Sequence, residues 1–315
     1  MKTAVLIPCY NEAMTIEKVV TDFARVLPDA RIYVYDNNSA DGTGDIAAAA
    51  GAHVVKEYRQ GKGFVVRSMF ADIDADIYIL TDGDDTYPAE AAPALIAPIA
   101  EGRADMTVGD RLSNGTYYSE NKRRFHDFGN NLVRMFINGL FRADIKDVMT
   151  GYRAFSRYFV KNFAVMSGGV EIETELTLHA LDKRFAIEQI PIDYRDRPAG
   201  SQSKLNTVKD GIRVLKTLFS IFKDYKPLRF YGFLALIFFL TGLAAGIPVI
   251  AEYAATEYIT HVPLAILASA LEIIALLSLS NGMVLDTLVK ADKRRYELDL
   301  VRYRGEHPRN EAKTA

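Results

Sequence analysis

The first two hundred residues alternate between two kinds of hydrophobic pattern. Short runs rich in β-branched and aromatic residues, typical of strands, occupy residues 3–8, 31–36, 52–55, 76–82 and 105–110. Longer stretches that indicate helices lie between them, at residues 13–27, 42–50, 62–71 and 88–100. Strands that alternate with helices predict an α/β domain with a mostly parallel sheet covered on both faces. Such sheets bind ligands beyond the carboxyl ends of their strands.

The last third of the chain has a different pattern. Residues 230–250 contain no charged residue, and residues 262–285 are apolar except for Glu272 and a few small polar residues. At about 1.5 Å per residue, each stretch can cross a hydrocarbon core of roughly 30 Å. We therefore expect a two-helix transmembrane hairpin. Two buried helices of a soluble core are the alternative, but core helices rarely lack charge over so many positions.

A third pattern precedes the hairpin, within residues 206–229. Apolar residues recur there at spacings of three and four, and basic residues fill the other faces; the apolar set is Val208, Ile212, Leu215, Phe219 and Phe222. The spacing predicts a basic amphipathic helix in the headgroup layer of a membrane, with packing on its own domain as the alternative. Residues 132–141 form a shorter apolar stretch, for which core packing and membrane contact are equally good interpretations.

Charge changes this picture in two ways. The chain has 315 residues with 38 basic and 40 acidic side chains, so no basic excess indicates a nucleic-acid partner. Basic residues flank both expected spans on one side, whereas the link at 251–261 has two Glu and no Lys or Arg. This bias predicts a multi-pass protein of the inner or plasma membrane, with the catalytic domain and both chain ends in the cytoplasm.

The N-terminus and the cysteine content agree with a cytoplasmic catalytic domain. The first apolar run is too short for a signal peptide and ends at Pro8. Cys9 is the single cysteine of the chain, so no intrachain disulfide can form. We therefore expect a reducing compartment.

Polar motifs follow three of the predicted strands, as PCYNE (8–12), DNNSADGT (36–43) and TDGDDTYP (81–88). The third motif holds Asp82, Asp84 and Asp85, whose carboxylates repel one another unless a cation or water screens them. Mg²⁺ or Mn²⁺ takes one or two carboxylates together with phosphate oxygens. An Asp/Gly-rich turn is the alternative. Polar groups at three neighbouring strand ends favour a shared metal and ligand site.

The ordered motifs PCYNE, DNNSADGT, GKG, DGDDTYP, GDR, GYRAFSR and RPAGSQSKLN resemble a known family. They are similar to the family 2 GT-A glycosyltransferases, in the branch of dolichyl-phosphate mannose synthase and the bacterial polyprenyl-phosphate glycosyltransferases. The resemblance covers roughly residues 1–225. It implies a Rossmann-like GT-A catalytic domain at 1–205, followed by the amphipathic helix, the hairpin and a basic cytoplasmic tail at 290–315.

The resemblance also implies site residues. Pro8, Tyr10, Glu12 and Asp36, with Asn38 of the same motif, would bind the nucleotide; Asp82 would lie near the ribose and Asp84 on the metal. Thr86 stands where many of the family's mannose synthases carry Gln, so Asp85 is a candidate second ligand. Arg123 and Arg124 match the basic pair associated with the lipid phosphate, and Arg197, Ser203 and Lys204 match a loop that closes on the donor diphosphate. Lys62 or Lys204 would add a point charge for phosphate.

Other polar residues are weaker candidates. Glu171, Glu173, Glu175 and Asp147 are candidate sugar contacts; Tyr152 and Arg153 fit a structural role equally well, and His126 fits a structural role.

The expected activity is transfer of a sugar, from a UDP-linked hexose or N-acetylhexosamine, to undecaprenyl or a related polyprenyl phosphate. A phosphate monoester is largely dianionic near neutral pH, so it needs no general base, and in-line attack inverts the anomeric carbon. One rival is a transferase of the same fold that acts on a hydroxyl of diacylglycerol or a saccharide, which would need a base. The other is a membrane-tethered nucleotide-binding protein without activity. We also allow for a homo-oligomer.

Overall fold

The computed structural model describes residues 1–113, 124–195 and 207–307, with residues 124–130 and 207–215 described by their backbone. The chain forms two compact units, Met1–Gly211 and Ile212–Ala315. Each unit is described by itself below.

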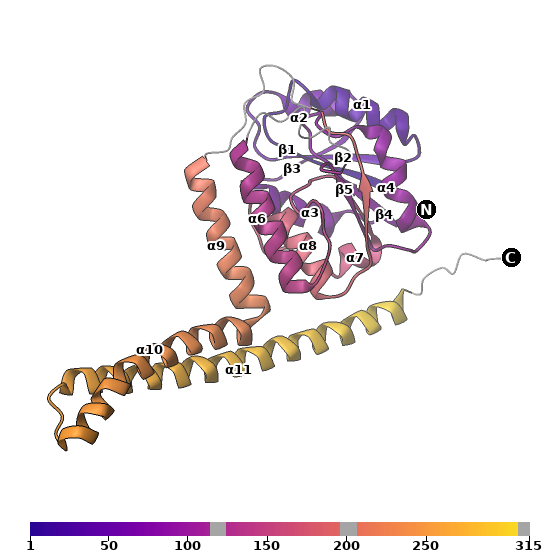
Figure 1. The fold of residues 1–315 in the computed structure, drawn as a ribbon. Helices are drawn as coiled ribbons and strands as arrows, with labels where there is room; N and C mark the ends of the chain where they lie inside the picture. Colours follow the sequence, from indigo (N-terminus) through magenta and orange to yellow (C-terminus); the bar gives the residue numbers. More distant parts are fainter. Residues whose placement is uncertain (114–123, 196–206, 308–315) are drawn as a thin grey trace. The chain divides into compact units, whose positions relative to one another are not determined.

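The first unit is built on one seven-stranded sheet (Figure 1). Its strands are β1 (Thr3–Cys9), β2 (Arg31–Asp36), β3 (His53–Lys56), β4 (Ile77–Leu80), β5 (Met106–Asp110), β6 (Arg153–Ser156) and β7 (Ile187–Pro191). They lie in the order β3-β2-β1-β4-β6-β5-β7, and only β6 runs antiparallel to its neighbours. The prediction of a mostly parallel sheet is thus confirmed.

Helices cover both faces of this sheet. Neighbouring strand residues point to opposite faces, so apolar side chains on each face pack against helices. The helical elements are α1 (Ile16–Val26), α2 (Thr43–Ala49), α3 (Lys62–Asp72), η1 (Ala89–Ala91), α4 (Ala92–Ala100), α6 (Arg124–Phe141), α7 (Arg157–Lys161) and α8 (Ile172–Asp182). In β4, Ile77 and Ile79 join the core under α1, α2 and α4. Tyr78 faces the other side, where its ring lies 6.3 Å from that of Phe70 in α3. The expectation of a sheet covered on both faces is therefore confirmed.

The register of the central strands brings the predicted motifs to one edge. Cys9 at the end of β1 pairs with Asp36 at the end of β2, and Leu6 pairs with Leu80 at the end of β4. All three strands are parallel, so the segments that follow them leave the sheet at the same edge. The three polar motifs therefore lie at neighbouring strand ends, as the sequence predicts.

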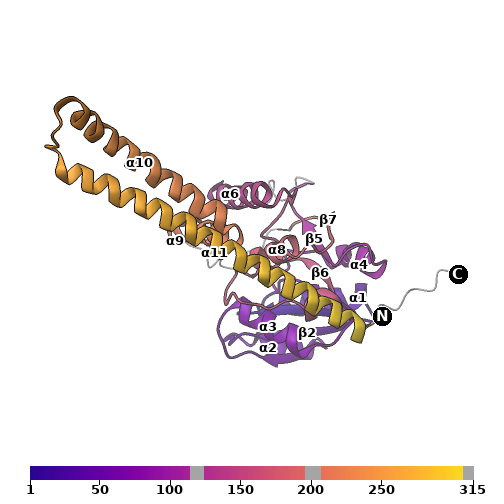
Figure 2. The same ribbon diagram turned by 90° about the horizontal axis from the view of Figure 1, so that it is seen from below.

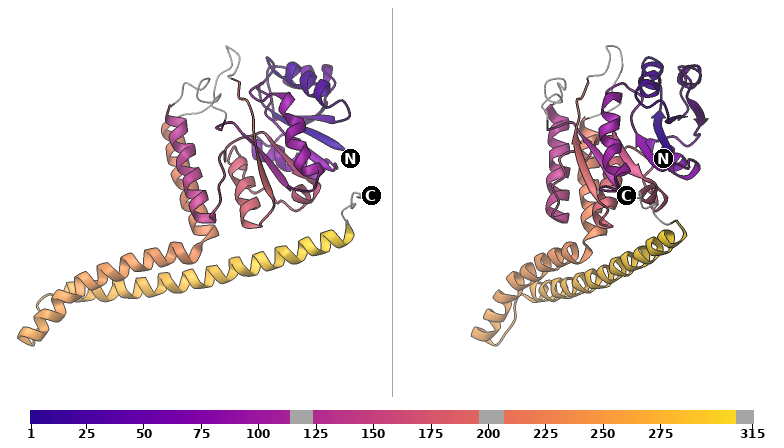
Figure 3. Two further views of the ribbon diagram at one scale, coloured as in Figure 1. Left: turned by 45° about the vertical axis from the view of Figure 1, so that its right-hand side comes forward. Right: turned by 90° about the vertical axis from the view of Figure 1, so that its right-hand side faces the viewer.

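The second unit contains the long apolar helices. After α9 (Thr207–Tyr225), which begins in the first unit, come α10 (Pro227–Thr256) and α11 (Val262–Glu306). Both α10 and α11 are long and apolar enough to cross a membrane. They lie side by side for most of the length of α10 (Figures 2 and 3). A two-helix membrane anchor fits this unit.

The helix ends differ from those expected for the spans alone. The α10 helix continues to Thr256, six residues into the expected link, and α11 continues to Glu306, through much of the basic tail. Residues 251–256 (AEYAAT) include good helix formers and no Pro or Gly, so nothing stops the helix where the apolar span ends. The apolar limits of a span and the limits of its helix are separate properties.

Candidate active site

Asn37 and Asn38, in the motif after β2, hold the loop that leads to α3. The buried Asn37 amide donates to the carbonyls of Glu57 (2.9 Å) and Arg59 (2.8 Å), and its Oδ1 accepts from the Gly61 amide (2.7 Å). Asn38 has a left-handed backbone (φ 64°) and donates to the Tyr58 carbonyl (2.9 Å). These bonds fix the segment before α3, a structural role that the sequence analysis did not foresee.

The remaining predicted nucleotide contacts lie at the same edge. Pro8 is buried in β1 beside Tyr35, and the Tyr10 side chain that follows is 38% exposed. Asp36 accepts a bond from the Ser39 amide (3.1 Å), and the Glu12 amide donates to Thr43 Oγ1 (2.9 Å). Hydrogen bonds within the chain thus hold the loops after β1 and β2 at the strand ends.

Lys62 joins two of the predicted carboxylates. Its Nζ lies 2.5 Å from Asp82 Oδ1 and 2.6 Å from Glu173 Oε1, and only 16% of its side chain is exposed. Burial on its own would lower the pKa of Lys62, but the two carboxylates outweigh this effect and hold that pKa above its usual value. Burial raises the pKa of Glu173, although Lys62 opposes the shift. Lys62 is therefore a fixed positive charge beside the Asp82 carboxylate.

Close backbone packing makes this arrangement possible. A Cβ atom at Gly63 would lie 2.1 Å from the carbonyl oxygen of Ser167, so only glycine lets the start of α3 approach that loop. A Cβ atom at Gly151 would lie 2.7 Å from Asp82 Oδ2. Steric exclusion at these two positions explains why glycines accompany Lys62 and Asp82.

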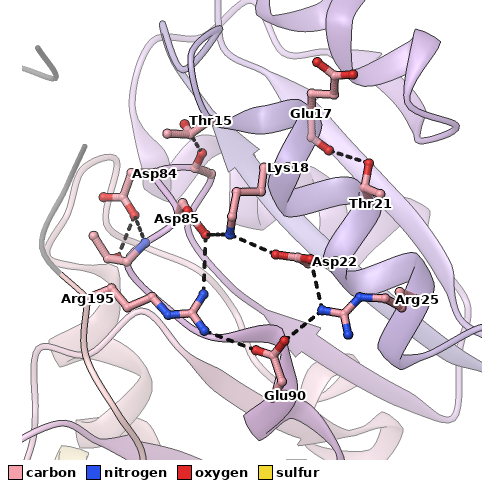
Figure 4. A network of polar contacts seen from close by, with 12 residues as sticks. Thr15, Glu17, Lys18, Thr21, Asp22, Arg25, Asp84, Asp85, Glu90 and Arg195 are labelled. Atoms are coloured by element: carbon pink, nitrogen blue, oxygen red, sulfur yellow. Dashed lines mark hydrogen bonds and ion pairs between the residues drawn. The ribbon is translucent and has the colours of Figure 1, made fainter. Parts of the chain in front are cut away.

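The three aspartates of the turn after β4 point to different partners. Asp84 is buried, and its Oδ1 accepts bonds from Thr86 Oγ1 (2.6 Å) and the Thr86 amide (3.2 Å). Asp85 instead accepts a bond from Lys18 Nζ of α1 (2.7 Å), as Figure 4 shows. Asp82 therefore faces Lys62, Asp84 is bonded within the turn, and Asp85 faces α1.

The donor set fits a metal shared with a substrate. Among residues 1–113, 124–195 and 207–307, no three His, Cys, Asp or Glu side chains gather as an all-protein metal site. A Mg²⁺ or Mn²⁺ ion bound through one or two carboxylates and through substrate phosphate oxygens needs no such group. Asp82 and Asp84 fit that second kind of site.

The segment before β6 is structural. Asp147 is fully buried and ion-paired with Arg111, its oxygens 2.7 and 3.0 Å from the guanidinium. Arg153 is also fully buried and donates to the carbonyls of Val148 (2.7 Å) and Thr150 (3.0 Å); burial lowers the pKa of Arg153 to about 10. Asp147, a candidate sugar contact, instead braces the loop.

Tyr152 and the acidic residues around α8 also have defined roles. The buried Tyr152 hydroxyl donates to the Pro88 carbonyl (3.1 Å), so Tyr152 and Arg153 both take the structural role that was one of their two interpretations. Glu175 accepts bonds from the amides of Met166 and Ser167, both 2.8 Å. Glu171 immediately precedes α8. Of the three glutamates, Glu173 is the one in contact with Lys62 at the strand edge.

Several predicted residues lie outside the described part of the chain. Arg123, Arg197, Ser203 and Lys204 belong to the segments 114–123 and 196–206. Arg124 begins α6, and His126 lies in the same helix; both are described by their backbone only. Their roles stay predictions.

Comparison with known proteins places the chain in a family. The fold is similar to that of glucosyl-3-phosphoglycerate synthase from Mycobacterium tuberculosis, solved with Mn²⁺, UDP-glucose and glycerol 3-phosphate. The TM-score is 0.57 at 21% identity, over 70% of this chain and 79% of that one. A mixed, mostly parallel sheet of this kind, with its acidic motif at a strand end, defines a GT-A glycosyltransferase fold. Residues 4–163 match the family described as glycosyl transferase family 2, so the chain belongs to that family and is a glycosyltransferase.

Two relatives from Haloferax volcanii extend the likeness. The glycosyltransferase AglJ is 32% identical over 286 residues, which is 90% of this chain and 93% of AglJ. A dolichyl-phosphate hexose transferase is 29% identical over 218 residues, which is 69% of this chain and 92% of the relative. The similarity to AglJ therefore extends beyond the sheet-bearing unit into the long helices.

Proposed function

We propose that this protein transfers one sugar from a nucleoside diphosphate, probed first as UDP-linked hexose or N-acetylhexosamine, to polyprenyl phosphate at the cytoplasmic face of a membrane. The observation that carries the proposal is that one chain combines a glycosyltransferase domain with two long apolar helices. Lys62, Asp82 and Asp84 lie at the strand edge of a glycosyltransferase, and two apolar helices follow. A relative named for transfer of hexose to dolichyl phosphate supports the same acceptor class.

The donor site is assigned to the strand edge. Tyr10, Glu12 and Asp36 surround the place for the base and ribose, while Asp82 and Asp84 would hold a Mg²⁺ or Mn²⁺ ion against the diphosphate. The ion would offset the negative charge that develops on the departing nucleoside diphosphate. Lys62 orients the Asp82 carboxylate, and Arg197, Ser203 and Lys204 would contact the diphosphate from the loop after β7.

The acceptor site is assigned to Arg123 and Arg124. A lipid phosphate is a phosphate monoester with its second pKa near 6, so it is largely dianionic near neutral pH and is itself the nucleophile. One of its oxygens bonds to the anomeric carbon while the bond from that carbon to the nucleoside diphosphate oxygen breaks. No proton needs to move. Attack in line with the leaving group inverts the anomeric configuration, and the two arginines align the phosphate for it.

The membrane part is assigned an orientation. Lys223, Lys226 and Arg229 precede the apolar span at 230–250, and basic residues follow the apolar part of α11, whereas the connecting residues carry only acidic charge. Spans at 230–250 and 262–285, with both ends in the cytoplasm, follow from this distribution. A cysteine introduced at Thr256 should react with an impermeant thiol reagent in intact cells, and one introduced at Ala315 should not. The opposite labelling pattern would reverse the orientation.

Incubation of the purified chain with Mn²⁺, undecaprenyl phosphate and a panel of UDP- and GDP-sugars tests the activity. Lipid mass spectrometry should detect undecaprenyl phosphate carrying one added sugar with one donor of the panel. Free sugar as the sole product, or no product with any donor, would contradict the proposal.

The two arginine groups can then be separated. Loss of a charge-assisted contact costs about 1.5–3 kcal/mol, or roughly ten- to a hundredfold in affinity. Substituting both Arg123 and Arg124 by Gln should lower the apparent affinity for polyprenyl phosphate and leave nucleotide binding near wild type. Arg197→Gln should do the reverse. Because KM equals an affinity only when chemistry is slow, nucleotide binding should be measured directly. Loss of nucleotide binding in the Arg123 and Arg124 variant would contradict the assignment.

A further inference from the structure

Six charged side chains close a ring beside the turn that carries Asp84 (Figure 4). Three cations and three anions alternate around it. The contacts are Lys18–Asp22 (2.9 Å), Asp22–Arg25 (3.1 Å), Arg25–Glu90 (2.8 Å), Glu90–Arg195 (3.4 Å), Arg195–Asp85 (3.9 Å) and Asp85–Lys18 (2.7 Å). We call this set the charge ring. It joins four separate parts of the chain: α1, the Asp84 turn, η1 and the segment after β7.

The charge ring contacts the turn through Asp85. Lys18 Nζ and the Arg195 guanidinium both approach Asp85 Oδ1. The Arg195 amide also donates to the Thr86 carbonyl (3.1 Å), so the next residue is held as well. The bond from Lys18 holds the pKa of Asp22, a neighbouring member of the ring, below its usual value.

The conformation that the charge ring holds is an unusual one. Asp85 has φ 58°, in the left-handed region that a few per cent of non-glycine residues occupy, Asp and Asn more often than most. Asp84 immediately precedes Asp85, and Thr86 immediately follows it. The Oδ1 atom of Asp84 accepts a bond from Thr86 Oγ1. The position of the Asp84 carboxylate therefore depends on the backbone at 85 and 86, the two residues that the ring holds.

A contribution to overall stability is the simpler explanation of the charge ring. The small energy expected from such exposed ion pairs argues against that role. The side chains of Lys18, Arg25 and Arg195 are 53%, 60% and 45% exposed. Ion pairs this exposed contribute little to the free energy of unfolding. A local effect on the Asp84 turn needs much less energy than a global one.

We infer that Lys18 and Arg195 are positioning residues for the metal, which act through Asp85 to place Asp84. This inference rests on the proposed function, in which Asp84 binds the cation. Neither residue touches the reacting atoms. Removal of either should loosen the placement of Asp84 and weaken binding of the metal.

The test measures Mn²⁺ affinity of the full chain in detergent by the electron paramagnetic resonance signal of free Mn²⁺. UDP or GDP is present, whichever the donor panel selects. Lys18→Met and Arg195→Met should each raise the Mn²⁺ dissociation constant about three- to tenfold, less than the 10–100-fold typical for a direct partner of a ligand. Lys18→Arg keeps the charge and should stay close to wild type. The Mn²⁺ concentration for half-maximal turnover should shift in parallel.

Arg103→Met is the matched control, because Arg103 is 52% exposed and forms ion pairs with Glu101 and Glu188, outside the charge ring. It should leave Mn²⁺ affinity within about twofold of wild type. If wild type binds Mn²⁺ and both ring variants bind it equally well, or if the control weakens binding as much as they do, the ring inference is wrong and the proposed function stands. If wild type binds no Mn²⁺ with its nucleotide, the metal role in the proposed function fails first.

Discussion

Lys62 Nζ lies 2.5 Å from Asp82 Oδ1, a contact that ties the first residue of α3 to the turn after β4. The same ammonium group lies 2.6 Å from Glu173. One buried positive charge thus stands between two carboxylates that would otherwise repel each other. This contact holds the Asp82 carboxylate at the edge where the donor diphosphate is proposed to bind.

Removal of Lys62 should cost both stability and activity. In Lys62→Met, Asp82 and Glu173 are left without their cation, and loss of one partner of this partly buried ion pair costs about 1–3 kcal/mol. Thermal unfolding followed by circular dichroism in detergent should show a lower midpoint. The double variant Lys62→Met with Glu173→Gln should regain part of that stability and stay inactive. Wild-type stability of the single variant would contradict the buried charge assignment.

Asp84→Asn should separate metal binding from folding. The Asn side-chain oxygen can still accept the bonds from Thr86, so the turn should persist while the metal loses an anionic ligand. We expect turnover to fall by two or more orders of magnitude with an unchanged unfolding midpoint. EDTA should have the same effect on wild type. Asp74→Asn, at an exposed surface ion pair with Arg157, should stay active. Full activity in EDTA would remove the metal from the account.

His179 should make the sheet-bearing unit sensitive to acid. Its ring lies 4.8 Å from that of Phe163 and 5.6 Å from those of Phe159 and Phe185, and burial lowers the pKa of His179 to about 3. Below pH of about 6.5, the unfolded chain binds a proton there that the folded chain does not, so stability falls as pH falls. From pH 7 to 5 the loss is up to about 2 kcal/mol.

The measurement is the unfolding midpoint against pH. His179→Phe should flatten the curve between pH 7 and 5, whereas His53→Gln, at an exposed site on β3, should leave its slope unchanged. A wild-type slope in His179→Phe would show that other groups cause the acid sensitivity.

Gly242 should be essential to the pairing of α10 with α11. A Cβ atom there would lie 2.6 Å from Glu272 Oε1, so Gly242→Leu must displace the Glu272 side chain of α11 or push the helices apart. Overpacking of this kind costs about 1–3 kcal/mol. Gly232 of the same helix has nothing within 4 Å of its Cβ position, so Gly232→Leu is the control. The Gly242 variant should lose helicity at lower SDS concentration. Equal resistance of the two variants to SDS would contradict close packing of α10 against α11 at Gly242.

The sequence predicts the strand edge well, because in parallel sheets the ends of successive strands share an edge. Asp36 and Asp82 could be assigned to one site from their positions alone. The roles of Asn37 and Arg153 could not be assigned from the sequence. An amide or a guanidinium at a strand end can hold a loop as well as bind a ligand. Only the distances of Asn37 to Glu57 and Gly61 decide between the two.

One contact and one strand could not be predicted from the sequence for another reason. Lys62 and Glu173 are 111 positions apart, and no periodic pattern connects them. The strand β6 is four residues long and carries the buried Arg153, so neither its length nor its composition marks it as a strand. By contrast, the helix-forming residues at 251–256 do signal that α10 continues past its span.

The most direct test of the central claim compares two acceptors that differ by one phosphate. The purified chain is incubated with its sugar donor and either undecaprenyl phosphate or undecaprenol, and the lipids are analysed by mass spectrometry. The account predicts one added sugar on undecaprenyl phosphate, with one nucleoside diphosphate released per sugar transferred, and no product on undecaprenol. Sugar transfer to undecaprenol, or to a diacylglycerol in place of undecaprenyl phosphate, would contradict it.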